Sequence, residues 1–292
     1  MSERLADVAA HVRAVRQIGA VVNAMRGLSS ARAQRARALL PAIRAYADVS
    51  GKAMARVLPG QPAEAAPARR GSPPPPTLIV FGAQQGFAGA FADQVLNAAA
   101  PEMPGSHVMM AGARAAAIAR ERGLAPAWTT DMPDRPASVS AMATELVEAL
   151  YDHITASGST SVGMIVPVWT GDRGVWITRR PLLPLDKDRF RLDGPASDPP
   201  LTTLPAPVLI ARLAEEYVFA QLCEAAMEAY VAENQARVEA MVAAKAHIDD
   251  QLKALEQRAH EVRQDEITEE VIELASARRK RPGAPSGLGQ AQ

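Results

Sequence analysis

Apolar residues near both ends of the chain recur in alternating steps of three and four. Near the N-terminus the positions are Leu5, Val8, Val12, Val15, Ile18, Val22 and Met25. In the last third they are Leu213, Tyr217, Ala220, Glu224, Met227, Val231, Asn234, Val238, Met241, Lys245, Ile248, Leu252, Leu255, Ala259 and Val262, all apolar except Glu224, Asn234 and Lys245. Such steps give a narrow stripe, typical of a coiled-coil seam rather than the broad face of a globular helix. The pattern predicts two long helices that each need a partner.

The C-terminal helix is predicted to be very long, because no Gly or Pro occurs between Val208 and Leu274. At ~1.5 Å per residue it would extend over roughly 100 Å, several times the diameter of a small domain. An isolated helix is marginal in water, so its stability should come from packing. The N-terminal helix is the partner available within the chain, and we predict an antiparallel coiled coil. Pro41 is predicted to kink or interrupt the N-terminal helix, because it lacks an amide donor.

Between the two helices, short apolar runs alternate with helical segments. The runs are 77–81, 107–111, 161–169 and 174–180, and the helical segments are 90–100, 113–123 and 138–156. Strands that alternate with helices imply crossover connections and a mostly parallel sheet. The predicted fold class is therefore α/β: a Rossmann-like domain with a mostly parallel sheet, flanked by a long antiparallel coiled coil of the N- and C-terminal helices.

These changes in pattern divide the chain into five predicted parts. They are an N-terminal coiled-coil helix at 1–58, a Pro-rich linker at 59–76, an α/β domain at 77–207, a long C-terminal coiled-coil helix at 208–277 and a disordered basic tail at 278–292. Within the α/β domain, residues 186–207 are rich in Pro and Asp and are predicted to form a loop.

Composition narrows the class of protein. Lys and Arg together number 32, as do Asp and Glu, so the chain lacks the basic excess of a general nucleic-acid binder. The single Cys223 excludes an intramolecular disulfide, and its place in a helical pattern favours a buried, inert thiol over a nucleophile. No apolar run of about 18 residues and no signal-peptide core occur. We expect a soluble, intracellular protein without direct membrane insertion.

The sequence offers little catalytic chemistry. The turn GAQQGFAG, residues 82–89, lies between a strand and a helix, where some α/β proteins bind phosphate. Its spacing is not Gly-x-Gly-x-x-Gly and no Gly-Lys-Ser/Thr follows, so a structural turn is favoured. The five histidines lack metal-ligand spacing, and no Ser lies in a nucleophile elbow. We predict no active site, no cofactor and no metal within this chain.

Three segments resemble the gamma subunit of F-type ATP synthases. They are VRAVRQIGAVVNAMRGLSSARAQRAR near the N-terminus, LIVFGAQQGFAGAF after the linker, and EYVFAQLCEAAMEAYVAENQARVEAMVAAKAHIDD followed by VRQDEITEEVIEL near the C-terminus. The Glu-Asn-x-Ala-Arg-x-x-x-Met and Arg-Gln-x-x-Ile-Thr runs are the most specific. The chain departs from the family at Gln84, Gln85 and Ala88, where the family has a charged pair and Cys, so it resembles a divergent member.

The resemblance implies a non-catalytic central rotor shaft that transmits rotation of the membrane c-ring to the catalytic beta subunits. The implied partners are the alpha and beta subunits of the catalytic ring, the epsilon subunit and the c-ring, with no nucleic acid. The implied location is peripheral, at the cytoplasmic face of a bacterial plasma membrane. By position in the family motifs, the residues expected to contact beta subunits are Met25, Arg26, Arg237, Arg263, Gln264 and Thr268.

Two other classes of function stay open on the sequence. One is a coiled-coil scaffold or adaptor with an inserted α/β domain that binds some other partner. The other is a small-molecule enzyme of the doubly wound kind, with long helices for oligomerisation. Co-purification with alpha and beta subunits would distinguish the rotor shaft from the first class, and cofactor binding by residues 77–207 would indicate the second.

Overall fold

The computed structural model of the chain describes residues 5–57, 74–185 and 201–279. Most of the predicted linker, most of the basic tail and the first part of the predicted loop at 186–207 lie outside these residues. The chain divides into two compact units, which are described separately. The sheet unit comprises Met25–Met241, and the end unit comprises Met1–Ala24 together with Val242–Gln292.

The sheet unit is built on five strands in the order β3-β2-β1-β4-β5. Strands β1 (Thr77–Phe81), β2 (His107–Ala111), β3 (Trp128–Thr130) and β4 (Val162–Thr170) are parallel, and β5 (Gly174–Leu183) pairs antiparallel with β4. This mostly parallel sheet, with the long terminal helices, confirms the predicted fold class. The four predicted strands are present, whereas the three-residue β3 was not predicted.

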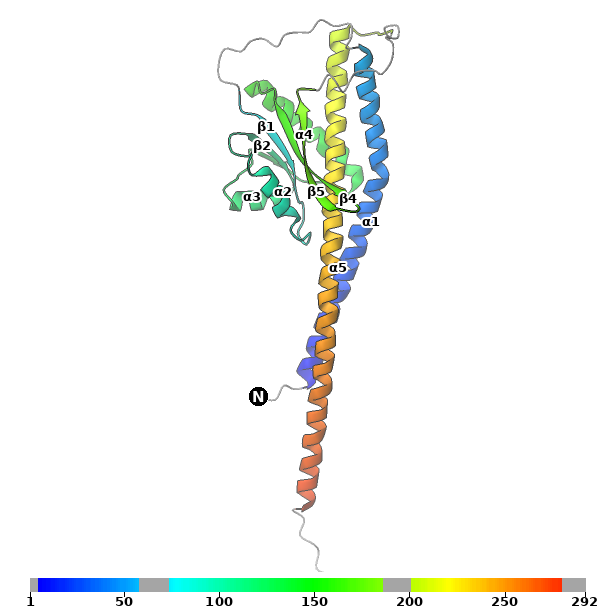
Figure 1. The fold of residues 1–292 in the computed structure, drawn as a ribbon, viewed down its shortest axis with the longest axis vertical. Coiled ribbons are helices and arrows are strands. Elements are labelled where there is room, and N and C mark those ends of the chain that lie inside the picture. Colours follow the sequence, from blue (N-terminus) through cyan, green and yellow to red (C-terminus); the bar gives the residue numbers. More distant parts are fainter. Residues whose placement is uncertain (1–4, 58–73, 186–200, 280–292) are drawn as a thin grey trace, which may run out of the picture. The chain divides into compact units, whose positions relative to one another are not determined.

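Helices cover both faces of the sheet (Figure 1). Alternate residues of β1 and β2 point to opposite faces, since Leu78 and Val80 pack with α2 (Phe91–Ala99) and α3 (Ala113–Glu121). The residues between them pack with α4 (Val139–Ser157), which follows the short 3-10 helix η2 (Pro136–Ser138), and with the central part of α5. A sheet buried on both faces explains why its strands read as continuous apolar runs.

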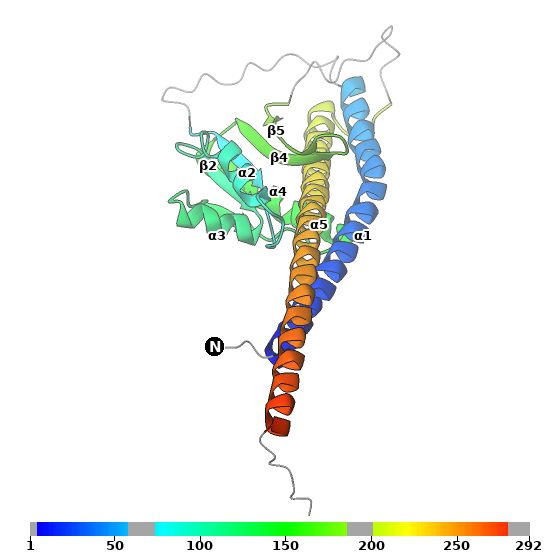
Figure 2. The same cartoon turned by 60° about the horizontal axis from the view of Figure 1, so that its bottom comes forward.

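Two long helices, α1 (Leu5–Val57) and α5 (Ala206–Arg279), contribute to both units. Within the sheet unit they lie side by side and antiparallel (Figures 1 and 2). Arg44 of α1 forms ion pairs with Glu224 (2.8 Å) and Glu228 (2.7 Å) of α5, while the Tyr46 hydroxyl, farther along α1, donates to the earlier Glu216. Ala36 and Leu40 of α1 join the same core as α4 and α5.

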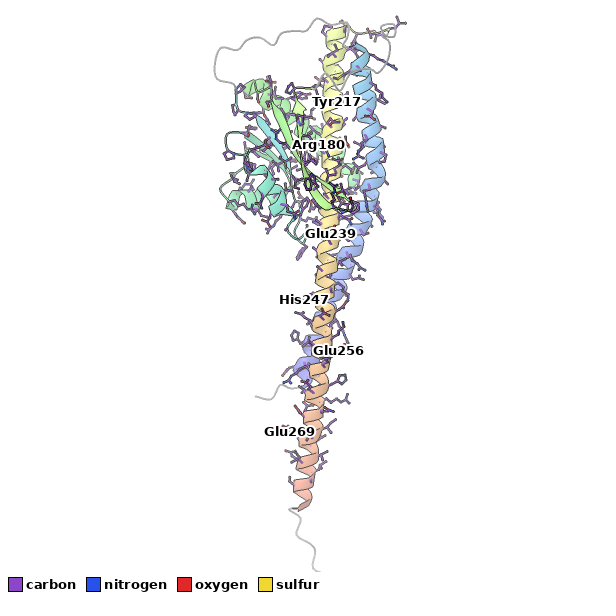
Figure 3. All side chains as sticks on the ribbon, in the orientation of Figure 1. Arg180, Tyr217, Glu239, His247, Glu256 and Glu269 are labelled. Atoms are coloured by element: carbon purple, nitrogen blue, oxygen red, sulfur yellow. The ribbon has the colours of Figure 1, made fainter. Side chains whose placement is uncertain are left out.

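The same antiparallel pairing is found within the end unit. Arg16 pairs with Glu256 at 2.7 Å, and the backbone N–H of Leu5 donates to Glu266 at 3.3 Å. The last turns of α5 continue past the first described residue of α1, and the labelled Glu269 lies on this stretch (Figure 3). Every residue from 263 to 276 is exposed.

The predicted seam of the C-terminal helix is confirmed, because none of its fifteen positions is exposed. The N-terminal seam is wrong at one position. Ile18 is 56% exposed, and Gly19 is buried in its place. A Cβ on Gly19 would lie 3.2 Å from Cγ2 of Ile248, so the Ile248 side chain fills the space that a seam residue would otherwise occupy.

Of the two predicted effects of Pro41, the interruption of the N-terminal helix is wrong, since α1 continues through it, and the kink stays a prediction. Pro41 is exposed, so its ring does not disturb the packed side of the helix. Leu40 and Ala47 on the packed side are 9% and 4% exposed. Burial on both sides of the proline offsets the one helical hydrogen bond that it cannot donate.

Candidate functional site

The turn after β1 meets α5 at a densely bonded site within the sheet unit. We call this site the junction. It is formed by Arg32 of α1, Gln84 and Gln85 of the turn, Pro133 and Asp134 of the loop before η2, and Tyr230, Glu233, Asn234 and Arg237 of α5. These residues are brought together because β1 ends beside α5, and the chain must reverse there to enter α2.

A buried ion pair lies at the centre of the junction. The Arg237 guanidinium approaches the Glu233 carboxylate at 2.6 Å, and the side chains are only 5% and 6% exposed. The two residues are four apart on α5, the spacing at which helical side chains meet. Such a pair is stabilising only when its remaining donors and acceptors are satisfied, and both residues have further partners.

Glu233 binds the backbone of the glycine turn. Its two carboxylate oxygens accept hydrogen bonds from the N–H groups of Gln84 and Gln85, each at 3.0 Å. Consecutive backbone amides of this kind form the cradle that binds phosphate in nucleotide-binding loops. Because a carboxylate of the same chain takes these amides, the geometry supports the predicted structural turn.

Arg237 holds the other side of the turn. Its Nε donates to the Gly86 carbonyl at 3.1 Å, and Nη2 reaches the Gln85 carbonyl at 3.5 Å. Nη1 lies 3.5 Å from the side-chain oxygen of Asn234, whose amide in turn donates to the carbonyl of Tyr230. A single guanidinium therefore bonds a carboxylate and two carbonyls at once, which its planar array of donors allows.

Gln84 joins the turn to the rest of the sheet edge. Its side-chain oxygen accepts from the backbone N–H of Ala113 at 3.0 Å and of Met132 at 2.8 Å. Ala113 is the first residue of α3, and Met132 follows β3. The side chain thus satisfies amides at two neighbouring crossover connections, and movement of the turn would disturb both.

Tyr230 completes the junction on the side of the loop before η2. Its hydroxyl donates to the Asp134 carbonyl at 3.1 Å, and burial raises the pKa of its phenol. Asn234, one of the three polar positions of the predicted seam, is 3% exposed and bonded inside the junction. The polar seam residue therefore connects α5 to the sheet edge.

A second charged cluster fixes α5 to α1 and β5. The Glu228 side chain is 4% exposed and pairs with Arg44 of α1 and with Arg180 of β5, each at 2.7 Å. Arg180 is labelled in Figure 3. The hydrogen bonds that the Arg44 guanidinium donates to Glu224 and Glu228 raise its pKa. Unlike the ion pair of the junction, which lies within α5, this cluster matches charges across three separate elements of the sheet unit.

The structure places the six predicted contact residues in different surroundings. Arg237 is buried in the junction, Met25 is half-buried and Arg26 is exposed. Arg263, Gln264 and Thr268 are exposed in the end unit, where the Thr268 hydroxyl donates to the Gln264 carbonyl at 2.8 Å. Their contacts with another subunit stay predictions. Sequence reasoning missed Glu233 and Gln84, although the spacing of four between Glu233 and Arg237 is a signal for an ion pair.

Titratable side chains elsewhere in the described ranges include a pair of stacked histidines and a buried thiol. The rings of His107 and His153 stack at 3.5 Å, and burial, with a smaller contribution from His153, lowers the pKa of His107. Burial raises the pKa of the Cys223 thiol to about 11, which makes it a poor nucleophile. Among the described residues, no group of three or more His, Cys, Asp or Glu side chains is arranged to hold a metal ion.

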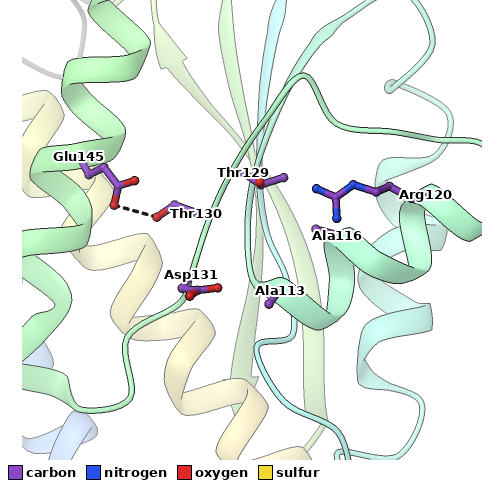
Figure 4. Close-up of a pocket in the computed structure, with 7 residues that line it drawn as sticks. All are labelled: Ala113, Ala116, Arg120, Thr129, Thr130, Asp131 and Glu145. Atoms are coloured by element: carbon purple, nitrogen blue, oxygen red, sulfur yellow. Dashed lines mark hydrogen bonds between the residues drawn. The ribbon is translucent and has the colours of Figure 1, made fainter.

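A hollow of about 440 Å³ lies at the ends of β2 and β3, lined by Ala113, Ala116, Arg120, Thr129, Thr130, Asp131 and Glu145 (Figure 4). The Thr130 hydroxyl donates a hydrogen bond to the Glu145 carboxylate at 2.9 Å, so these two polar groups of the lining already bind each other. The hollow lies beside the edge strand β3, and Ala113 in its lining donates its backbone N–H to Gln84 of the glycine turn. Its position does not support the dinucleotide site considered for a doubly wound enzyme, which lies where the strand order reverses.

Within the described residues, no helix combines the length and apolar character needed to span a bilayer. Glu and Arg side chains recur along both long helices, and the buried part of α5 contains Glu228, Glu233 and Arg237.

Comparison with known proteins identifies the family. The family model described as ATP synthase matches residues 4–279. No curated protein matches the chain. Among solved structures, a chain of the Euglena gracilis mitochondrial ATP synthase (OSCP/F1/c-ring, rotational state 3) is 12% identical, with a TM-score of 0.64, over 98% of this chain and 99% of that one.

Two further structures share the fold at similarly low identity. A chain of the rotor of Euglena gracilis mitochondrial ATP synthase has a TM-score of 0.61 and 12% identity, covering 90% of this chain and 98% of its own. A chain of the Tetrahymena thermophila mitochondrial ATP synthase central stalk and c-ring has a TM-score of 0.51 and 14% identity, covering 77% and 99%. With the family model matched over nearly its whole length, the chain belongs to the gamma-subunit family of F-type ATP synthases.

Proposed function

We propose that this protein is the central rotor shaft of an F-type ATP synthase, and that it transmits rotation of a membrane c-ring to catalytic beta subunits. The observation that carries the proposal is the architecture of a family member: a 74-residue helix that is paired antiparallel with α1 in each unit. ATP synthesis or hydrolysis takes place on the beta subunits in this proposal. This chain supplies mechanical coupling.

The mechanism requires a helix that resists twisting and a firm attachment to the part of the protein that is driven. Helix α5 contains Pro207 only in its first turn and has no Gly or Pro from Val208 to Arg279. The junction and the Glu228 cluster attach α5 to the turn after β1, to β5 and to α1 through buried charges. Torque applied to the sheet unit would pass into α5 through these bonds rather than through loosely packed surface contacts.

An asymmetric shaft would meet each beta subunit with a different face. A subunit that contacts one face more favourably in its open state than in its closed state is shifted toward the open state. Rotation would then move each beta subunit through its states in turn. The size of that shift is limited by the difference in contact energy between the two states.

The six residues predicted from the family motifs are proposed to act at the contacts with beta subunits. Arg26 and Arg263 are exposed, and a guanidinium binds a partner's carboxylate through two parallel hydrogen bonds. Gln264 and Thr268 lie within five residues of Arg263 on α5. Arg237 has its partners inside the chain, so it would contribute by fixing the turn at residues 84–86 rather than by a direct ion pair.

The proposed partners are the alpha and beta subunits, the epsilon subunit and the c-ring. The proposed location is peripheral, as part of the complex, and the cytoplasmic face of a bacterial plasma membrane stays a prediction. The solved structures with this fold are mitochondrial complexes. The five-part division of the chain into domains likewise stays a proposal.

A pull-down from native membranes tests this function. The full-length chain carries an affinity tag, the membranes are solubilised in mild detergent, and the captured subunits are identified by mass spectrometry. We expect alpha, beta, epsilon and c subunits in addition to the chain itself. Capture of the chain without alpha and beta subunits would contradict the proposal and favour a scaffold with some other partner.

A further inference from the structure

Two imidazole rings lie face to face at the edge of the sheet where its parallel strands begin. His107 is the first residue of β2, and His153 lies near the end of α4. Their ring centroids are 3.5 Å apart and the ring planes differ by 12°, so the rings are stacked. Both residues are half-buried. The pair therefore joins a strand to the helix that covers it, at a place that solvent protons can reach.

The His153 ring is positioned by the end of its own helix. The Ser157 hydroxyl donates to the His153 carbonyl at 2.8 Å and accepts from the Ser159 N–H at 3.1 Å. The same oxygen lies 3.4 Å from Nε2 of His153. Because a hydroxyl has only one proton to donate, Nε2 must be the donor in this contact. In the neutral ring Nδ1 is then the nitrogen without a proton, and a further proton binds there.

The sheet edge beside the pair also holds the start of β1. The backbone N–H of His107 donates to the Pro76 carbonyl at 2.9 Å. The N–H of Thr77 donates to the Ser161 carbonyl at 2.9 Å. Thr77 is opposite His107 in the strand register, and its hydroxyl is buried with no hydrogen-bond partner among the described residues. A buried hydroxyl without a partner reduces stability, so a further unfavourable interaction at this edge favours its opening.

The loops around the pair offer no charge that could balance a protonated ring. Residues 74–76 lead into β1, residues 124–127 lead into β3, and residues 158–161 connect α4 to β4. None of these three segments contains an Asp, Glu, Lys or Arg. Any balancing carboxylate must therefore come from the helices or from the loop before β2.

Carboxylates on those elements are exposed to water or bound elsewhere. Glu148 and Asp152 of α4 are exposed. Glu102, in the loop before β2, accepts from Nε of Arg179 with both oxygens, at 2.7 and 2.8 Å. Glu215 of α5 forms an ion pair within its own helix. Positive charge on the two rings is thus balanced mainly by solvent.

The number of protons on the pair decides whether stacking is favourable. One imidazolium can stack on a neutral ring, but two charged rings 3.5 Å apart repel each other. Burial, and to a smaller extent the charge of His153, lower the pKa of His107 below its ordinary value of 6.5. Because this pKa is lower in the folded chain, its contribution to stability is present above pH 6.5 and is lost as the pH falls below that value.

We propose that the stacked rings of His107 and His153 form a pH-sensitive clasp. The clasp holds the starts of β1 and β2 against the end of α4 while at least one ring is neutral, and it opens when both rings are protonated. Opening exposes the N–H groups of Thr77 and His107 to solvent and leaves the opposite edge of the sheet in place. The inference does not depend on the proposed function, because the clasp is formed and tested within this chain alone.

Hydrogen exchange of the full-length chain, followed by mass spectrometry, tests the clasp. Peptides that cover residues 74–80 and 105–110 report on the two strand starts, and residues 164–169 of β4 are the internal reference. Exchange rates are corrected for their intrinsic dependence on pH. With both rings protonated, we expect the protection of the strand starts to fall roughly sevenfold or more relative to the reference, since two unit charges at this distance repel by that factor even in bulk water. Protection that stays constant from about pH 7.5 to about pH 5 would overturn the proposal.

Two histidine variants identify the source of the pH dependence. His153→Phe keeps a planar ring for stacking but cannot bind a proton, so protection of the strand starts should no longer depend on pH. His260→Phe makes the same change at an exposed histidine of the end unit and should behave like the parent chain. An equal fall in protection in the parent and in His153→Phe would show that other groups cause the opening, and the clasp would be refuted.

A measurement on the parent chain decides the matter even if phenylalanine disturbs the edge. The chain has five histidines, so nuclear magnetic resonance of a histidine-labelled sample can follow each ring through a pH titration. The stacked rings should titrate as a coupled pair, each with a broadened curve, and the amide signal of Thr77 should shift with the second protonation step. Two independent titrations at positions 107 and 153, each with the shape of an isolated histidine, would contradict the proposal.

Discussion

Residues 218–237 and residues 263–276 belong to the same helix, yet their surroundings are opposite. In the first stretch no residue is exposed, and 16 of the 20 are buried, including Glu228, Glu233 and Arg237. In the second stretch every residue is exposed, including Ile267, Val271, Ile272 and Leu274, at 52–69%. The first stretch is specified by contacts with the sheet, with α4 and with α1.

The second stretch accepts one hydrogen bond from α1, from the Leu5 N–H to Glu266, and otherwise relies largely on its own residues and on whatever binds it. Its internal side-chain bonds include Thr268 to the Gln264 carbonyl and Ser276 to the Glu273 carbonyl. A helix with only local interactions is marginal in water, and four large apolar side chains gain nothing from exposure. The proposed function provides a cover, because the end of the helix would lie inside the catalytic ring. The comparison thus separates residues that hold this chain together from residues that are proposed to contact partners.

The largest effect is expected from breaking the buried ion pair of the first stretch. Arg237→Ala leaves the Glu233 carboxylate buried without its partner and removes the donor to the Gly86 carbonyl. Loss of one member of a buried pair typically costs about 3–5 kcal/mol. Urea unfolding of the isolated chain, followed by circular dichroism, measures the change in the free energy of unfolding.

Arg16→Ala is the matched control, because it removes a guanidinium from an ion pair of nearly the same length in the end unit. The pair with Glu256 is 2.7 Å long, but its side chains are 61% and 48% exposed. An exposed pair contributes about 0–1 kcal/mol. Equal losses in Arg16→Ala and Arg237→Ala would mean that the junction is no stronger than a surface contact.

A smaller loss is expected from truncating one seam residue. Ile248 is 7% exposed and packs over Gly19, so Ile248→Ala should cost about 2–3 kcal/mol, near the lower end for buried Ile. Ile267→Ala removes the same atoms from a side chain that is 52% exposed and should be close to neutral in the isolated chain. The same unfolding measurement compares them. A substantial loss in Ile267→Ala would show that the second stretch is packed in the free chain.

The second stretch should matter once the complex is assembled. Arg263→Ala combined with Gln264→Ala removes two exposed polar side chains, so the stability of the isolated chain should not change. If these residues contact beta subunits, ATPase activity of the assembled complex should fall about tenfold, the effect of losing roughly 1.4 kcal/mol. Assembly, measured by co-purification, should survive. Full ATPase activity in the double variant would remove both residues from the proposed contact.

Most of the fold could be predicted from the sequence, because the spacing of apolar residues along the chain indicates most of its helices and strands. The C-terminal seam could be placed to the residue, since steps of three and four specify one side of a helix. The N-terminal seam was misplaced at Ile18, because glycine carries no apolar signal and Gly19 is recognised only through Ile248 opposite. Strand β3 is three residues long, too short for a period, and depends on pairing with β2.

The junction was less predictable than the fold. The hydrogen bond between Gln84 and Glu233 joins residues 149 positions apart, and no local pattern connects them. Arg237 was singled out by its family motif, but its burial could not be read from that motif. Pro41 shows the converse limit. Proline does lack the amide donor that a helix interior needs, but the packed residues on both sides of Pro41 outweighed that loss and α1 continues.

The smallest predicted effect concerns Cys223, which lies in the buried stretch. Burial raises the pKa of its thiol from 9.0 to about 11, so the folded chain keeps this proton to higher pH than the unfolded chain. Stability from this difference is present below pH 9 and is lost as the pH rises from 9 towards 11. The loss should reach about 1 kcal/mol at pH 10. Because other groups titrate in this range, the measurement is the difference in pH dependence of unfolding between the parent chain and Cys223→Ala.

As a control for access, Cys223→Ala combined with Ala275→Cys places the thiol in the exposed stretch, where iodoacetamide should alkylate it rapidly in the folded chain. Equal alkylation rates at positions 223 and 275 would contradict the contrast between the two stretches of α5.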